Sequence, residues 1–262
     1  MCRFLAYCGE PILIGSLLLQ PKRSLVAQSL AAREAKTVTN ADGCGIGWFG
    51  EVAEPGLYRG VLPAWSDANL ASLCGQLRSR QFLAHVRSAT SGETTIANCH
   101  PFAAGHHLFM HNGQIGDYER LRRGIDAMIP ERSYGLRQGT SDSEAIFLIA
   151  WSERFETDPV GAVGRSLAAI RSIMLAAGTR KALRFAAAHG DGERLWAYRW
   201  ASDGRPPSLY WRRMPHGVVV ASEPYDDEAG VWTAMPPASL LQVDRGGEVQ
   251  VTPSEAMSYG AP

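Results

Sequence analysis

The order of strand-like and helical segments constrains the fold of this chain more than any other feature. Alternating or glycine-rich apolar segments predict strands at residues 3–7, 45–50, 82–87 and 107–111. Apolar residues at helical spacing predict helices at residues 70–77, 145–155 and about 160–176. After Gly178, short apolar segments separated by turn residues predict strands at residues 183–188, 194–198, 209–212, 218–221 and 240–243. Strands, then a block of helices, then strands predict an α+β fold with antiparallel sheets.

The chain has the length and uniformity of one domain. Its 262 residues can enclose a sizeable core without a metal or a disulfide. Low-complexity segments, internal repeats and linkers rich in Pro, Gly and Ser are not visible in the sequence. We therefore expect a single domain over residues 2–262.

Charge and cysteine content exclude several function classes. Lys plus Arg and Asp plus Glu each number 26, so no net field attracts nucleic acid or an anionic membrane. Apolar runs fall far short of the roughly 18–20 residues that cross a bilayer, and no signal peptide is visible. Five cysteines without a CxxC pair, and histidines without ligand spacing, argue against a metal or other cofactor. A cytoplasmic protein that acts on small molecules is the expectation.

Cysteine at position 2 is the first candidate for chemistry. Removal of Met1 would leave the Cys2 thiol, with a free pKa of about 8.5, beside an α-amine of pKa about 7.7–8.0. That amine can accept the thiol proton directly or through one water, so Cys2 can act as a nucleophile without a separate base. The alternative is an ordinary cysteine in a buried first strand.

The segment from His85 to Gly92 ends a predicted strand with an arginine and small hydroxyl residues. Arg87 offers a planar guanidinium that can bind a carboxylate through two hydrogen bonds. Thr90 and Ser91 add neutral donors beside it. The alternative is a strand-end arginine in a surface salt bridge.

The tripeptide His111-Asn112-Gly113 closes another predicted strand. Asn112 can offer a side-chain N–H, and Gly113 an unhindered backbone N–H, to one developing oxyanion. The same Asn-Gly pair is also the commonest hairpin turn, so both interpretations stay open.

The segment Thr140-Ser141-Asp142-Ser143-Glu144 opens a predicted helix. Ser141 and Glu144 have the spacing of a capping box, which explains them without a function. The anion of Asp142 is stabilised in the first turn and could receive a substrate ammonium, or it is only a favourable helix start.

Together these residues describe one ligand. Arg87 would bind an α-carboxylate, Asp142 an α-ammonium, and Asn112 with Gly113 a carbonyl that Cys2 attacks. A γ-glutamyl compound carries these three groups.

The chain resembles the class II glutamine amidotransferases, a family of N-terminal-nucleophile hydrolases. The motifs that carry the resemblance, in order, are Met1-Cys2, the segment from Asn40 to Gly47, the segment from Arg87 to Gly92, His111-Asn112-Gly113 and the segment from Ser141 to Glu144. The resemblance implies a four-layer αββα sandwich of two antiparallel sheets. It also implies that Cys2 is the nucleophile, Asn112 and Gly113 the oxyanion donors, and Arg87 and Asp142 the substrate ligands.

Larger members of that family append a domain that uses the released ammonia, whereas this chain resembles the stand-alone type. Among stand-alone members it especially resembles the γ-glutamyl hydrolase type of ergothioneine biosynthesis, through Met1-Cys2-Arg3, residues 86–90 and residues 221–227. Gly43-Cys44-Gly45 stands where that type has Gly-Trp-Gly, a departure that bears on the substrate. The segment 221–227 either lines the rim of the site or is an acidic surface loop.

Three functions follow as hypotheses. The first is a free-standing hydrolase that cleaves a γ-glutamyl amide through a thioester on Cys2. Water is the acceptor of the acyl group, and glutamate is released. The second is a glutaminase subunit that delivers ammonia to a separate synthase partner. The third is a scaffold with an inactive site. A homo-oligomer is compatible with each.

Overall fold

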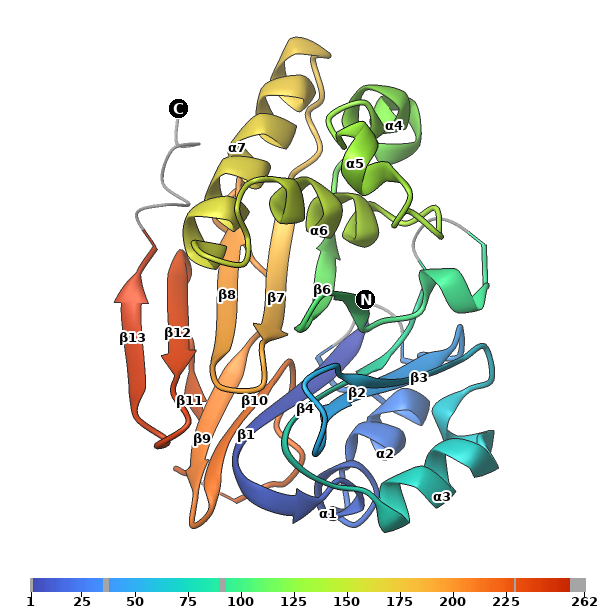
Figure 1. Ribbon diagram of the computed structural model, residues 1–262, viewed down its shortest axis with the longest axis vertical. Helices are drawn as coiled ribbons and strands as arrows, with labels where there is room; N and C mark the ends of the chain where they lie inside the picture. The colour runs from blue at the N-terminus through green and yellow to red at the C-terminus, as the bar shows by residue number, and fades with distance from the viewer. Residues whose placement is uncertain (1, 35–37, 90–92, 229, 255–262) are drawn as a thin grey trace.

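The computed structural model describes residues 2–34, 38–89, 93–228 and 230–254. Within these residues the strands form two antiparallel sheets that face each other, and helices cover both outer sides (Figure 1). The first sheet has the order β11-β9-β10-β1-β4-β2-β3 and the second β13-β12-β8-β7-β6-β5. The predicted four-layer αββα sandwich is confirmed.

The strand bounds follow from the ladders. The first sheet contains β1 (Arg3–Leu13), β2 (Cys44–Phe49), β3 (Gly56–Gly60), β4 (Arg78–Val86), β9 (Tyr210–Met214), β10 (Gly217–Ala221) and β11 (Thr233–Ala234). The second contains β5 (Phe102–Ala104), β6 (His107–Gln114), β7 (Arg184–Gly190), β8 (Leu195–Ala201), β12 (Ser239–Val243) and β13 (Val249–Pro253).

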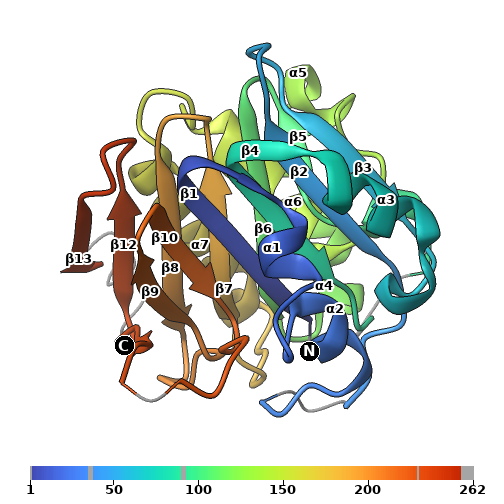
Figure 2. The same ribbon diagram turned by 90° about the horizontal axis from the view of Figure 1, so that it is seen from below.

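The helices divide between the two outer faces, as Figure 2 shows from below. The first sheet is covered by α1 (Gly15–Leu18), α2 (Leu25–Leu30) and α3 (Ala68–Gln76), and the short 3-10 turn Ala64–Ser66 joins that layer. The second sheet is covered by α4 (Tyr118–Asp126), α5 (Glu131–Tyr134), α6 (Asp142–Ser152) and α7 (Pro159–Ala176). A second 3-10 turn spans Ile96–Asn98.

Alternation along the strands separates three hydrophobic cores. Phe4 and Ala6 of β1 belong to the core between the sheets, whereas Leu5 and Tyr7 pack under α1, α2 and α3. In β6, Met110 faces the first sheet and Phe109 faces the helices on the other side. Successive side chains of a strand point to opposite faces, so this pattern also fixes the direction of residues beyond the apolar core.

Glycines of β2 let the two sheets and a loop approach closely. A Cβ on Gly45 would overlap the carbonyl oxygen of His100, and one on Gly47 would lie 2.7 Å from a methyl carbon of Leu108. Another backbone segment therefore comes close to this glycine-rich strand at Gly45.

The start of α6 forms only half of the expected capping box. Ser141 Oγ accepts the N–H of Glu144, as expected. The Glu144 carboxylate does not return to Ser141 but accepts the N–H groups of Gln138 and Gly139 at 2.9 and 2.8 Å. The N–H of Ser141 instead donates to Asn98. Partners outside the helix, including the distant Asn98, therefore fix this loop and place Asp142 at the first position of the helix.

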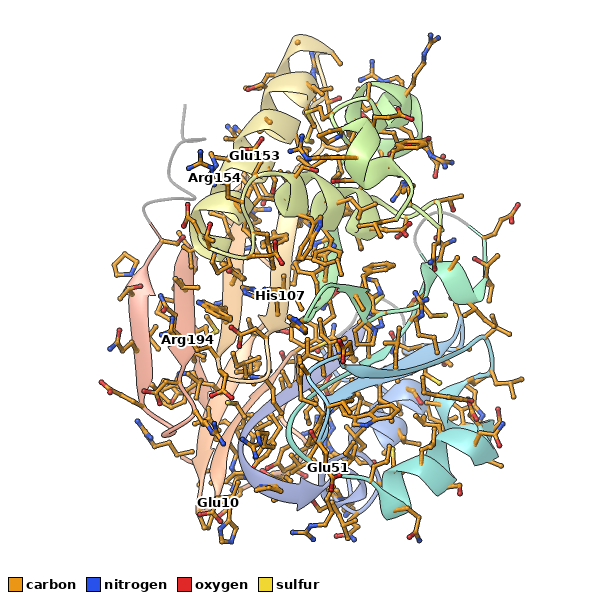
Figure 3. All side chains as sticks on the ribbon, in the orientation of Figure 1. Glu10, Glu51, His107, Glu153, Arg154 and Arg194 are labelled. Carbon is orange, nitrogen blue, oxygen red and sulfur yellow. The ribbon has the colours of Figure 1, made fainter. Side chains whose placement is uncertain are left out.

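Charged residues cover the exterior. Glu10, Glu153 and Arg194 are exposed, whereas His107 lies inside (Figure 3). Among the described residues, no helix has the length and apolar content needed to cross a membrane.

Candidate active site

Cys2 and Arg87 meet at the end of the first sheet. Arg3 of β1 pairs with Val86 of β4, so the next positions outward are Cys2 and Arg87. Cys2 shares the strand face of Phe4, and Arg87 that of Leu83, and both Phe4 and Leu83 belong to the core between the sheets. The thiol and the guanidinium therefore point into the end of the sandwich.

The Cys2 thiol lies against the backbone of Ser88. The Ser88 N–H donates to Cys2 Sγ over 3.4 Å, and Sγ lies 3.5 Å from the Ser88 carbonyl oxygen. Burial raises the pKa of the Cys2 thiol, against the Ser88 amide and Arg87, which lower it. The resting group is therefore the thiol, and its activation requires a proton acceptor.

Arg87 is a buried residue with 4% of its surface exposed, so the alternative of a surface salt-bridge arginine is wrong. Its backbone continues the β2–β4 ladder to Gly43, and Nη1 lies 3.5 Å from the Asp42 carbonyl oxygen. The Asp42 carboxylate accepts the N–H of Ala89 at 2.7 Å. Asp42 thus fixes the loop that begins with Arg87. Thr90 and Ser91 lie outside the described residues.

Asn112 and Gly113 lie inside β6, where they pair with Ala186 and Phe185 of β7. The hairpin-turn alternative is therefore wrong. Asn112 is fully buried on the face of Leu108 and Met110, which looks toward the first sheet. Within the described part of the chain, neither amide atom of Asn112 has a hydrogen-bond partner. A Cβ on Gly113 would overlap the carbonyl oxygen of Arg184, so only glycine fits there.

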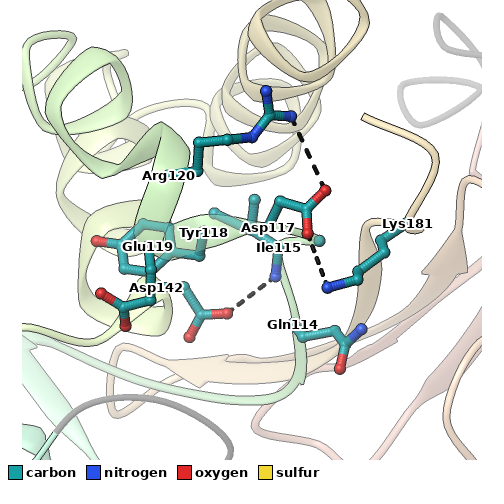
Figure 4. Close-up of a pocket in the computed structure, with 9 residues that line it drawn as sticks. Gln114, Ile115, Asp117, Tyr118, Glu119, Arg120, Asp142 and Lys181 are labelled. Carbon is teal, nitrogen blue, oxygen red and sulfur yellow. Dashed lines mark hydrogen bonds and ion pairs between the residues drawn. The ribbon is translucent and has the colours of Figure 1, made fainter. Parts of the chain in front are cut away.

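Asp142 contributes from the second sheet's helix layer. Its Oδ2 accepts the N–H of Ile115 at 2.9 Å, immediately after β6. It lines a cavity of about 410 Å³ together with Gln114, Tyr118 and Lys181 (Figure 4). Of the predicted site residues that the structure describes, only Asp142 lines this cavity. The cavity therefore adjoins the expected ammonium end of the site, and its volume does not include the thiol.

Rim residues of this cavity are charged. Asp117 forms ion pairs with Lys181 at 2.8 Å and with Arg120 at 3.9 Å (Figure 4). Asp117 has a positive φ of 57°, which is uncommon for a residue other than glycine.

Behind Cys2 lies a buried ion network that local sequence patterns do not reveal. The Arg3 side chain is fully buried and donates to the carbonyl oxygens of Ser222 and Glu34, each at 3.1 Å. Buried Glu223 accepts the N–H groups of Arg33 and Glu34 and pairs with Arg23. Residues 222–223 are therefore buried and bind Arg3 and the backbone of residues 33–34 near the nucleophile. They are not part of a simple surface loop. The only sequence signal for this network was the family resemblance at residues 1–3 and 221–227. The sequence pattern of neither segment indicates that the two are in contact.

Two of the buried histidines pack ring against ring. The rings of His85 and His100 stack with centroids 4.1 Å apart. Burial lowers the pKa of His85 to about 3 and that of His100 well below its usual value, so both rings are neutral near pH 7. Among the described residues, no group of three potential ligands surrounds a metal position.

Comparison with known proteins agrees with this fold. The family model of class-II glutamine amidotransferases matches residues 1–218, and the chain belongs to that family. The expectation of one domain that continues to residue 262 stays a prediction.

Particular relatives narrow the resemblance. The γ-glutamyl-hercynylcysteine sulfoxide hydrolase of Mycolicibacterium smegmatis is 34% identical over 255 residues, which cover 97% of this chain and all of the relative. A class-II domain structure from Silicibacter pomeroyi has 36% identity and a TM-score of 0.77, covering 97% of this chain and 99% of that one. The predicted resemblance to this hydrolase type is confirmed.

A more distant structure supports the fold alone. The glutamine phosphoribosylpyrophosphate amidotransferase of B. subtilis has 16% identity and a TM-score of 0.65, covering 97% of this chain and 49% of that one. The shared portion has the sandwich that the sequence resemblance implied.

Proposed function

We propose that this protein is a stand-alone hydrolase of γ-glutamyl amide bonds that releases glutamate. The observation that carries the proposal is the buried amide of Asn112, which has no hydrogen-bond partner in the described structure. It lies on the face of β6 that looks toward the first sheet, the sheet whose strand ends bear Cys2 and Arg87. A buried polar group without a partner is costly, and a substrate carbonyl would supply the partner. A hydrolase relative that aligns over its entire length also supports it.

The proposed reaction proceeds through a thioester. With Met1 removed, the α-amine of Cys2 accepts the thiol proton, and Sγ forms a bond to the γ-carbonyl carbon. The carbonyl oxygen becomes an oxyanion that accepts hydrogen bonds from Asn112 Nδ2–H and the Gly113 N–H. Collapse breaks the C–N bond, and the ammonium of Cys2 returns the proton to the leaving nitrogen. Water then hydrolyses the thioester to glutamate and the free thiol.

Two charged residues would orient the substrate. Arg87 binds the α-carboxylate, with Thr90 and Ser91 beside it, and Asp142 binds the α-ammonium. These groups lie at the end of the substrate that all γ-glutamyl compounds share. They select the acyl group and leave the choice of leaving amine to other residues.

Cys44 is not among the residues that we propose to select the leaving amine. Its side chain is in the core beneath α1, α2 and α3, where Sγ contacts the Leu62 carbonyl oxygen at 3.6 Å and Asp67 at 3.8 Å. It therefore points away from the inner face that bears Cys2 and Arg87. The departure at Gly43-Cys44-Gly45 therefore does not change the proposed substrate class. That class is a γ-glutamyl sulfoxide conjugate of the kind named for the M. smegmatis relative.

A cytoplasmic location is part of the proposal. The structure describes all five cysteines, and none is in a disulfide. An odd number of reduced thiols suits a reducing compartment.

A substrate screen tests the proposal. The purified protein, with Met1 removal verified by intact mass, is incubated with glutamine, glutathione, and γ-glutamyl thioether and sulfoxide conjugates, and glutamate release is followed. We expect turnover of the conjugates without any partner protein. Activity on glutamine alone, and only after a synthase is added, would instead support the glutaminase-subunit alternative. No release from any substrate by the processed protein would refute hydrolysis.

Arg87→Lys tests the proposed carboxylate contact. An ammonium cannot form the two parallel hydrogen bonds of a guanidinium, so KM for γ-glutamyl substrates should rise. Loss of such a buried charged contact costs about 2–5 kcal/mol. Steady-state kinetics with the preferred substrate measures it, and an unchanged KM would remove Arg87 from the site.

A further inference from the structure

Three side chains join β6 to the first turn of α6 in one hydrogen-bonded chain. His111 Nε2 lies 3.2 Å from the Arg184 carbonyl oxygen, and His111 Nδ1 lies 2.8 Å from Ser143 Oγ. Ser143 Oγ in turn lies 3.4 Å from Asp142 Oδ1. All three side chains are buried, with exposures of 1% for His111, 6% for Ser143 and 7% for Asp142.

The protons of this chain can be assigned from its fixed end. A carbonyl oxygen only accepts, so His111 Nε2 must carry a proton and donate to Arg184. Burial lowers the pKa of His111, although the nearby charge of Asp142 opposes the shift. The ring is therefore neutral, and Nδ1 presents a lone pair. Ser143 must then donate its hydroxyl proton to Nδ1 across the 2.8 Å contact.

This assignment leaves one carboxylate oxygen of Asp142 without a donor from Ser143. A hydroxyl has a single proton, and His111 receives it. Asp142 Oδ2 already accepts one hydrogen bond, from the Ile115 N–H at 2.9 Å. Oδ1 keeps its acceptor capacity, and Asp142 lines the cavity of about 410 Å³ from which a ligand can reach it.

We propose that His111 is a positioning residue that turns the Ser143 hydroxyl away from Asp142 and so reserves Oδ1 for the α-ammonium of the substrate. The inference rests on the proposed γ-glutamyl hydrolase function and extends it to a residue that touches no substrate. Without the acceptor at Nδ1, the Ser143 hydroxyl rotates toward Oδ1 and donates to it. The substrate ammonium then meets an oxygen that already accepts a hydrogen bond and has less acceptor capacity left.

A double-mutant cycle tests this role. His111→Phe keeps an aromatic ring beside Phe185, which His111 stacks on at 5.1 Å, and removes both ring nitrogens. A competing hydrogen bond to a charged group is expected to raise KM about tenfold, with kcat nearly unchanged. In the Ser143→Ala background no hydroxyl remains to compete, so the same His111→Phe change should alter KM less than twofold.

The KM pattern separates positioning from simple damage to β6. Because His111 precedes Asn112, a distortion of the strand would lower kcat, and the Ser143→Ala change would not suppress it. An equal effect of His111→Phe on KM in both backgrounds would overturn the inference. His111→Gln, whose amide supplies both an acceptor and a donor, should have a KM closer to the wild-type value than His111→Phe.

A substrate without the α-amine provides the last control. The corresponding glutaryl amide lacks the ammonium that Asp142 would bind. The KM for this amide should therefore be the same in the wild-type protein and in the His111 variant. The variant used is His111→Gln or His111→Phe, whichever is folded by circular dichroism. A KM defect of equal size on the glutaryl and γ-glutamyl substrates would contradict the inference. Failure of the wild-type protein to hydrolyse any γ-glutamyl amide would refute the proposed function itself, a result distinct from both.

Discussion

Cys2→Ala is expected to abolish turnover while the protein still binds its substrate. The change removes the attacking sulfur and leaves the proposed contacts of Arg87 and Asp142 intact. Removal of a nucleophile can cost about 10⁶ in kcat. Glutamate release measures turnover, and calorimetric titration with the uncleaved substrate measures Kd. Cys2→Ser should be nearly as inactive, because its hydroxyl is a far weaker acid than the thiol.

An uncleaved N-terminal tag is the matched control for the base. Such an extension leaves the Cys2 thiol in place and converts the α-amine into an amide, which cannot accept the thiol proton. Burial raises the pKa of this thiol, so the loss of the base should be severe. Proteolytic removal of the tag should restore activity. Full activity with the tag intact would show that the proton acceptor lies elsewhere, and wild-type rates for Cys2→Ala would refute the nucleophile.

Sequence patterns identified the central strands because those strands are buried on faces that alternate. Residues 3–7 alternate between two cores, and β1 continues from there to Leu13. The helix of residues 118–126 was missed because charged residues interrupt it, although Tyr118, Leu121 and Ile125 form its buried face. Short edge strands such as β11 and β13 have exposed residues and carry little periodicity. They are defined by their neighbours and not by their own composition.

The site was predictable in its residue types and not in its contacts. Asn112-Gly113 has the local sequence of a turn, and only its pairing with Ala186 and Phe185 identifies it as strand. Arg87 likewise cannot be told from a surface arginine until the sheets close over it. Both ambiguities are resolved by residues more than 40 positions away. The similarity of motif order anticipated the outcome because it carries information about such long-range contacts.

Hydrogen bonds that the local sequence does not specify explain why the capping box was only half right and why the Glu223 network was not predicted. The expected capping box depends on two residues three positions apart, yet Glu144 bonds to Gln138 and Gly139, and Asn98 satisfies Ser141. Glu223 is nearly 190 residues from the backbone groups that it accepts. Local propensity cannot account for Asn98 or for the partners of Glu223, since only tertiary packing brings these groups together.

Asn112→Ala should have the second largest effect, and its effect should fall on kcat. The Asn112 amide would strengthen its hydrogen bond as the carbonyl oxygen becomes an oxyanion, so kcat is expected to fall about 10²–10³-fold with little change in KM. In the described structure this amide has no partner, so its removal leaves no orphaned group behind. Loss of a hydrogen bond should therefore not lower the thermal unfolding midpoint of this variant. An unchanged midpoint would distinguish a catalytic defect from a general loss of stability.

Asn112→Asp is the shape-matched control, because it keeps the volume of the side chain and replaces the amide donor with an acceptor. Repulsion between a carboxylate and the oxyanion should make kcat at least as low as in Asn112→Ala. Steady-state kinetics and differential scanning calorimetry on both variants give the required values. A rise in KM at unchanged kcat would assign Asn112 to ground-state binding, and wild-type kinetics in both variants would reduce it to a buried residue of β6. Asn112 is fully buried within a strand, so movement of a loop cannot compensate for either substitution.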